Sequence, residues 1–170
     1  MGEIKIGRHT YGNPVRRGTG NTVTIGKFCS IAIGVILDGG FSHNTKFIST
    51  YPLHSWFPEC ANLPSNIVIK GDIEIGSDVW IGEGAAIMSG VKIGHGAVIG
   101  MRAIISKDVQ PYEIIVGAPQ KVLRKRFTDD QIEELLKIQW WNWSDEKVIE
   151  NAHLIQSENI EEFILKHYTT

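Results

Sequence analysis

Aliphatic residues return at every sixth position through the middle of the chain. From residue 69 to residue 105 each sixth residue is isoleucine, and another apolar residue precedes it by two. Such a pair puts two side chains on one face of a short strand, and the residues between pairs leave room for a turn. The isoleucines are Ile69, Ile75, Ile81, Ile87, Ile93, Ile99 and Ile105, and their partners are Ile67, Ile73, Val79, Ala85, Val91, Ala97 and Ala103.

A period of six is typical of neither an amphipathic helix nor a simple strand. A helix with 3.6 residues per turn drifts out of phase with it within a few repeats. Glycine follows the isoleucine at Gly76, Gly82, Gly94 and Gly100, where a corner favours a backbone without a Cβ atom. Short strands joined by corners and stacked in rungs form a parallel β-helix, which is the all-β fold that we predict.

The same period occurs earlier, between residues 23 and 37. Cys29 occupies one of its apolar positions, so we expect a small buried core residue there. Cys60 is the only other cysteine, and two cysteines are too few for a disulfide framework, so both are predicted to be free thiols. The earlier pairs are Val23 with Ile25, Cys29 with Ile31, and Val35 with Leu37.

Two segments break the period. Residues 38–66, "DGGFSHNTKFISTYPLHSWFPECANLPSN", contain turn-forming residues with aromatic residues among them. A long irregular loop inside a repeat is costly to order and usually has a function, so this loop is the first place to look for chemistry. Residues 8–20 are interpreted as a smaller interruption of the repeat, with no role beyond shaping a groove on the coil.

The chain changes character after residue 127. Thr128 and Gln131 predict a capping box at the start of a helix within residues 129–141, and further helices are expected after Ser144 and near Asn159. We therefore divide the chain into a β-helix domain, residues 1–127, and a helical extension, residues 128–170, packed on the outside of the coil. Three tryptophans are predicted to join the two parts: Trp140, Trp141 and Trp143.

Composition narrows the classes of function. The chain has 17 Lys and Arg against 19 Asp and Glu, for a net charge of -2, so no global field attracts nucleic acid or an anionic membrane. No apolar run has the length of a membrane span, and the first residues do not resemble a secretory leader. We expect a soluble protein of the cytoplasm.

These features together resemble the hexapeptide-repeat acyltransferases and, within them, the chloramphenicol and streptogramin type of xenobiotic acetyltransferase. The likeness begins at about residue 23 and lies in the hexads, in "DVWIGEGAAIMSGVKIGHGAVIG", in "KDVQPYEIIVGAPQKVLRKRF" and in "WWNWSDEKVIENA". It implies a left-handed coil with three hexads per turn. It also implies a homotrimer with active sites between subunits, acetyl-CoA as co-substrate, a small-molecule acceptor and no metal.

Acetyl transfer requires a base for the attacking hydroxyl or amine. Neutral histidine serves this role, because its ordinary pKa of about 6.5 leaves it largely unprotonated at cellular pH. His43 lies in the long loop, in "GGFSHNTKFISTYP", and matches the loop motif that carries the catalytic histidine of the family. His54 is the second candidate for the base. His153 and His167 fall in the tail, and His95 is expected to be an outward surface residue.

The resemblance also places the acceptor near the loop. Tyr51, His54 and Trp56 would line its binding site, although aromatic residues of a loop also pack it down. The residues just after His43 and the compact chain depart from the drug acetyltransferases. We therefore expect a sugar hydroxyl as acceptor, with an antibiotic as the alternative and with O- or N-acetylation open.

The coenzyme is expected along the later repeats. Trp80 matches a family residue beside the active site, with a subunit contact as the alternative. Lys121 and Arg124 would bind the phosphates of acetyl-CoA, unless they belong, with Lys125 and Arg126, to a solvated basic stretch. The predicted coenzyme residues are Trp80, Gly82, Gly100, Met101, Ser106, Lys107, Gly117, Pro119, Lys121 and Arg124.

Two other classes share the predicted scaffold. A zinc hydratase of the carbonic anhydrase type needs three histidines that meet between subunits, and the sequence has no local histidine pair of that kind. An ice-binding surface needs ranks of outward threonine, which residues 67–102 lack. Acetyl transfer is therefore the first hypothesis.

Overall fold

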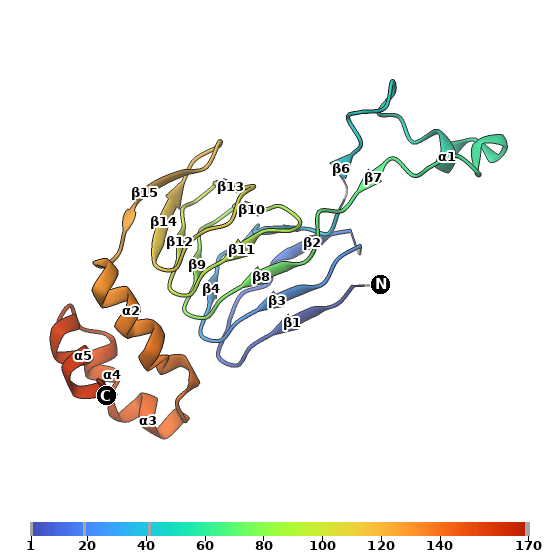
Figure 1. Cartoon of the computed structure of the whole chain (residues 1–170). Coiled ribbons are helices and arrows are strands. Elements are labelled where there is room, and N and C mark those ends of the chain that lie inside the picture. The colour runs from blue at the N-terminus through green and yellow to red at the C-terminus, as the bar shows by residue number, and fades with distance from the viewer. Residues whose placement is uncertain (1, 19, 41, 169–170) are drawn as a thin grey trace.

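Three faces of short strands form a coil in the computed structural model, which describes residues 2–18, 20–40 and 42–168 (Figure 1). The first face contains, in order, β1 (Ile4–Ile6), β3 (Val23–Ile25), β8 (Ile73–Ile75) and β11 (Lys92–Ile93). The second contains β4 (Ser30–Ile31), β9 (Trp80–Ile81), β12 (Val98–Ile99), β14 (Glu113–Val116) and β15 (Lys121–Lys125). The third contains β2 (Val15–Arg17), β5 (Ile36–Asp38), β10 (Ala86–Ile87) and β13 (Ile104–Ile105).

The six-residue period sets the register of these faces. Each turn of the coil places its isoleucine or leucine directly on that of the next, because neighbouring rungs pair in parallel. The nine stacked residues are at most 4% exposed, so each face contributes a ladder of aliphatic side chains to one core. The ladders are Ile25, Ile75 and Ile93; Ile31, Ile81 and Ile99; and Leu37, Ile87 and Ile105.

One predicted hexad lies outside the coil. Ile67 and Ile69 are 43% and 44% exposed, so the prediction that they are core residues is wrong. Strand β7 (Ile67–Val68) pairs antiparallel with β6 (Ser42–His43), while β5 pairs directly with β10 and leaves no place for a strand between them. The loop therefore continues past residue 66, and the coil resumes at β8.

The coil also begins earlier than predicted. Strand β1 pairs with β3, Tyr11 forms a bridge to Ser30, and β2 pairs with β5, so residues 4–17 make a first turn. The interpretation of residues 8–20 as an interruption is wrong for these positions. The end turn has a neighbour on one side only, which leaves Ile6 and Val15 about half exposed and weakens the apolar pattern.

The long loop projects from the coil as an arm (Figure 1). Its base is the β6–β7 pair, and it carries α1 (Leu53–Trp56) and the short 3-10 helix η1 (Pro58–Cys60). Apolar side chains lie open on the arm, with Ile48 fully exposed.

The described part of the tail, residues 128–168, contains α2 (Asp129–Ile138), α3 (Asp145–Glu150), α4 (Ala152–Ile155) and α5 (Ile160–His167), with the 3-10 helix η2 (Trp140–Asn142) after α2. The predicted capping box is confirmed, because Thr128 accepts the Gln131 N–H while the Gln131 side chain accepts the Thr128 N–H. Ser144 and Asn159 cap α3 and α5, whereas α4 was not predicted. No helix in the described ranges is long and apolar enough to span a membrane.

Aromatic contacts dock the tail on the coil. Trp141 is 2% exposed and stacks on His95 with ring centroids 4.7 Å apart, and Trp140 contacts Phe28 at 4.9 Å. Trp143 instead packs within the tail, against Phe163. The expectation that His95 is a surface residue is wrong, because the tail covers it.

Candidate active site

His43 occupies the base of the arm, at the end of β6. Its Nδ1 atom lies 2.6 Å from the carbonyl oxygen of Thr50, and its side chain is exposed. Because a carbonyl only accepts hydrogen bonds, this contact assigns the ring proton to Nδ1 and leaves a lone pair on Nε2. A general base requires such an unprotonated nitrogen open to substrate.

Asn66 holds the Thr50 carbonyl in place. It is 2% exposed, and its Nδ2 donates to the Thr50 oxygen at 2.7 Å. Its own backbone oxygen accepts the Asn44 N–H at 2.7 Å, which ties the two sides of the arm's base together. The sequence analysis missed Thr50, since a backbone carbonyl has no residue signature, and it missed Asn66, whose side chain meets that carbonyl only in the folded arm.

The arm contains a mostly apolar cavity that two predicted acceptor residues line. Tyr51 and His54 border it together with Phe47, Ile48 and Leu63. Trp56, the third predicted residue, does not line this cavity and is 69% exposed.

Four predicted coenzyme residues lie along the edge between the second and third faces. Gly82 N donates to Ile99 O at 2.8 Å, Gly100 N donates to Ile115 O at 2.7 Å, and Gly117 O accepts the Ile104 N–H at 3.1 Å. A Cβ atom on Gly82 would lie 2.6 Å from the backbone nitrogen of Met101, so the close stacking of turns requires glycine there. We name this edge the corner column: Gly82, Gly100, Met101 and Gly117.

The β14–β15 hairpin brings further predicted residues to the column. The Gln120 side-chain oxygen accepts the Ser106 and Lys107 N–H groups at 2.7 and 2.9 Å. Ser106 and Lys107 therefore lie beside the hairpin turn, which contains Gly117 and Pro119. The sequence analysis did not identify Gln120, whose role depends on the hairpin geometry.

The four residues of the basic cluster, Lys121, Arg124, Lys125 and Arg126, differ in their surroundings. Arg126 donates to Gly96 O at 2.7 Å and lies 3.5 Å from Asp78, and Lys125 pairs with Asp129, so both have structural partners. Lys121 and Arg124 are exposed on β15. Arg124 and Trp80, which is 57% exposed, line one groove on the second face.

Within one chain, the arm that carries His43 and the β14–β15 hairpin do not come together. The arm projects at one end of the coil, while the β14–β15 hairpin lies at the other end (Figure 1). Among the described residues, no three or more His, Cys, Asp and Glu side chains gather in a way that could hold a metal ion.

Several known proteins are similar to this chain in sequence. The bacterial transferase hexapeptide family (six repeats) matches residues 64–107. A probable macrolide acetyltransferase of Lysinibacillus sphaericus is 43% identical over 157 residues, which cover 87% of this chain and 85% of the relative. A chloramphenicol acetyltransferase of Agrobacterium fabrum is 44% identical over 142 residues, which cover 81% of this chain and 68% of the relative.

A solved structure shares the fold. A hexapeptide-repeat acetyltransferase of Vibrio cholerae, complexed with acetyl-CoA, matches with a TM-score of 0.57 and 27% identity over 74% of this chain. The match spans 61% of that protein, less than two thirds of its length. The coil and these relatives define an acyltransferase with acetyl-CoA as co-substrate. The chain belongs to the hexapeptide-repeat acetyltransferases and, within them, to the xenobiotic acetyltransferase branch.

Proposed function

We propose that this enzyme moves the acetyl group of acetyl-CoA to a hydroxyl of a small antibiotic-like acceptor, with His43 as general base. The observation that carries the proposal is the Nδ1 contact of His43 with the Thr50 carbonyl, which places the proton of the neutral ring on Nδ1 and leaves Nε2 of the exposed side chain as the nitrogen that can accept one. In a ternary complex, Nε2 takes the hydroxyl proton while the oxygen attacks the acetyl carbonyl. The tetrahedral intermediate then expels the coenzyme thiolate, which takes that proton from the imidazolium.

The coenzyme is proposed to lie along the corner column. A pantetheine arm can approach this edge closely because three of its four residues are glycines without a side chain, and Ser106, Lys107 and Pro119 border the same edge near the hairpin. Lys121 and Arg124 would bind the phosphates, because they are exposed cations without an acidic partner among the described residues. A backbone N–H is proposed to stabilise the oxyanion.

The active enzyme is proposed to be a homotrimer of left-handed coils, with each site between two subunits. The arm of one chain projects away from its own hairpin, which supports a site completed by a neighbour. Exposed apolar side chains on the arm, including Phe47 and Ile48, also favour a protein surface that covers them. Residues 1–127 would form the catalytic domain and residues 128–170 the helical extension, and the enzyme would work in the cytoplasm, where acetyl-CoA is available.

The choice of acceptor follows the relatives. Two of them are named for macrolide and chloramphenicol acetylation, so the antibiotic, which the sequence analysis gave as the alternative, now comes first. A sugar hydroxyl stays a prediction that these relatives do not support. The zinc-hydratase alternative has no feature of the described residues in its favour.

A thiol-release assay tests the proposed function. Purified protein with acetyl-CoA is offered chloramphenicol, a macrolide, a streptogramin, soluble sugars and nucleotide-sugars, with acceptor-free reactions as the control. We expect coenzyme release above the control with a hydroxyl-bearing antibiotic, and mass spectrometry should show one added acetyl group. Release with sugars alone would overturn the antibiotic assignment, and about one zinc ion per subunit without any acetyl transfer would favour the hydratase.

A further inference from the structure

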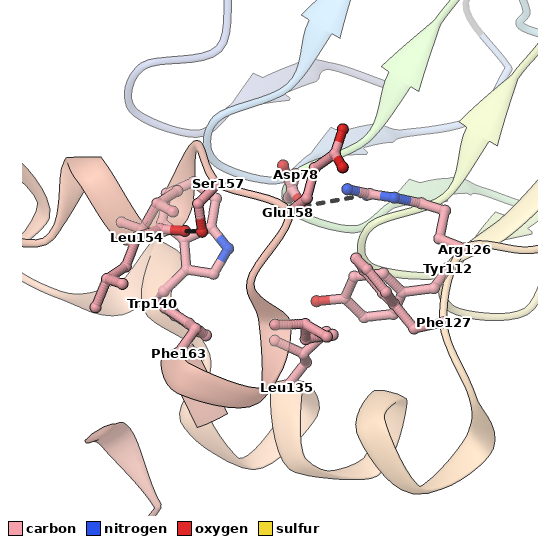
Figure 2. A pocket seen from close by; sticks show the side chains of 12 residues that line it. Asp78, Tyr112, Arg126, Phe127, Leu135, Trp140, Leu154, Ser157, Glu158 and Phe163 are labelled. Atoms are coloured by element: carbon pink, nitrogen blue, oxygen red, sulfur yellow. Dashed lines mark hydrogen bonds and ion pairs between the residues drawn. The ribbon is translucent and has the colours of Figure 1, made fainter. Parts of the chain in front are cut away.

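A second cavity lies between the helical tail and the coil, on the part of the molecule opposite the arm (Figures 1 and 2). Its volume is about 130 Å³, and its walls are mostly apolar, from Leu135, Trp140, Leu154 and Phe163. The acetyl-transfer proposal uses none of these residues. Apolar cavities of about 150 Å³ admit a single benzene ring, and this cavity is close to that size and open to solvent on one side, so a substituent on a ring can extend outward.

Tyr112 places an unpaired polar group in this wall. Its side chain is 1% exposed, and its buried hydroxyl has no hydrogen-bond partner among the described residues. Figure 2 shows the hydroxyl turned away from Arg126 and toward the space beside Leu135. Burial raises the pKa of Tyr112 well above its ordinary value, so the hydroxyl keeps its proton and can donate. An unpaired buried hydroxyl is costly unless a water or a ligand meets it.

The charges around the cavity limit what it can bind. Arg126 lies 3.5 Å from Asp78 and also donates to Gly96 O, so its charge is engaged by the protein. Glu158 adds a second carboxylate to the lining. Two carboxylates against one guanidinium disfavour an anionic ligand.

We propose that this cavity binds a small uncharged molecule with one aromatic or alicyclic ring and one hydrogen-bond acceptor, which receives the Tyr112 O–H. The ring contacts the apolar wall of the tail, and the acceptor replaces the missing partner of the hydroxyl. Asp78 and Arg126 also line the groove on the second face that contains Trp80 and Arg124, so this site shares a wall with a groove that holds two predicted coenzyme residues.

Benzamide is a suitable probe because it combines one ring with one uncharged carbonyl acceptor. Titration of the intact protein, followed by NMR of the tryptophan indole N–H groups, should perturb the Trp140 signal with a dissociation constant on the order of 1 mM. Benzoate, the matched anion, should bind at least about tenfold more weakly because of Asp78 and Glu158.

Tyr112→Phe identifies the donor. The variant loses an unpaired hydroxyl and keeps the ring, so it should melt at or above the temperature of the unmodified protein. Its benzamide affinity should fall about fivefold, the worth of one net hydrogen bond. Tyr11→Phe, which changes an exposed tyrosine of the coil, is the matched control and should leave the affinity unchanged.

Three results would overturn the proposal. They are no benzamide binding, equal affinity in Tyr112→Phe and the unmodified protein, and displacement of benzamide by acetyl-CoA with no Trp140 perturbation. The last would place the probe in the acetyl-transfer site. None of them bears on acetyl transfer itself, which the thiol-release assay measures separately.

Discussion

At the scale of single residues, the Thr50 carbonyl fixes the tautomer of His43, the proposed general base. Replacing His43 with Ala removes that nitrogen and leaves the corner column intact. We expect kcat to fall by about 10² to 10⁴ with little change in acetyl-CoA affinity, measured by steady-state kinetics and by direct binding. His54→Ala is the comparison, and its loss should be below about tenfold. Unchanged turnover in His43→Ala would refute the assignment.

Asn66 is proposed as a positioning residue for the same imidazole. Asn66→Asp keeps the size of the side chain but removes the N–H that donates to Thr50 O. The carbonyl then orients His43 less firmly, so kcat should fall roughly tenfold while the KM for acetyl-CoA stays the same. Asn62→Asp, at an exposed position of the arm, should change neither constant. Equal kinetics for both variants would remove Asn66 from the mechanism.

The sequence identified residues of this site unevenly. His43 could be proposed from the sequence because it lies in a loop that interrupts a strict repeat and matches a family motif, and its role as base stays a prediction. Thr50 and Gln120 were not, since one acts through its backbone and the other through a hairpin turn that no periodicity describes. Arg126 was grouped with a basic ligand cluster, but its partner Asp78 is 48 residues away in sequence.

At the scale of elements, the tail is attached to the coil through a histidine that must stay neutral. His95 Nδ1 accepts the Ser77 N–H at 2.8 Å, and its ring stacks on Trp141. Desolvation lowers the pKa of His95 below its ordinary value of 6.5. The unfolded chain therefore binds a proton more readily than the folded chain as the pH falls below 6.5.

This linkage predicts that the folded state is less stable in mild acid. The free energy of unfolding should be unaffected by His95 above pH 6.5 and should decline as the pH falls from 6.5 through the lowered pKa. Urea titrations at several pH values measure this free energy of unfolding. His95→Gln should flatten part of the decline, whereas His153→Gln, at an exposed position of the tail, should leave it unchanged. Identical pH profiles for His95→Gln and the unmodified protein would contradict the account.

The elements themselves were largely predictable, with errors at the ends of the repeat. The repeated aliphatic pairs predicted the stacked strands of the three faces, and the cap residues predicted α2, α3 and α5. The Ile67 hexad was misplaced because pairing with β6 competes with pairing in the coil, and periodicity cannot tell the two apart. Strand β1 was missed because an end turn buries little apolar surface.

At the scale of the whole molecule, the arm and the β14–β15 hairpin lie at different ends of the coil of one chain. The proposed trimer joins the arm of one subunit to the column of another. This claim can be tested with two inactive chains, His43→Ala and the double variant Lys121→Glu with Arg124→Glu. Both change exposed side chains, so both should fold.

The decisive measurement is the acetyltransferase activity of mixed oligomers made by co-expressing these two chains in equal amounts and purifying through a different tag on each. If each site takes its imidazole from one subunit and its basic residues from the next, every trimer that contains both chains restores one of its three sites. We predict about one third of the unmodified activity per site. Activity no higher than that of either inactive parent would contradict a site shared between subunits.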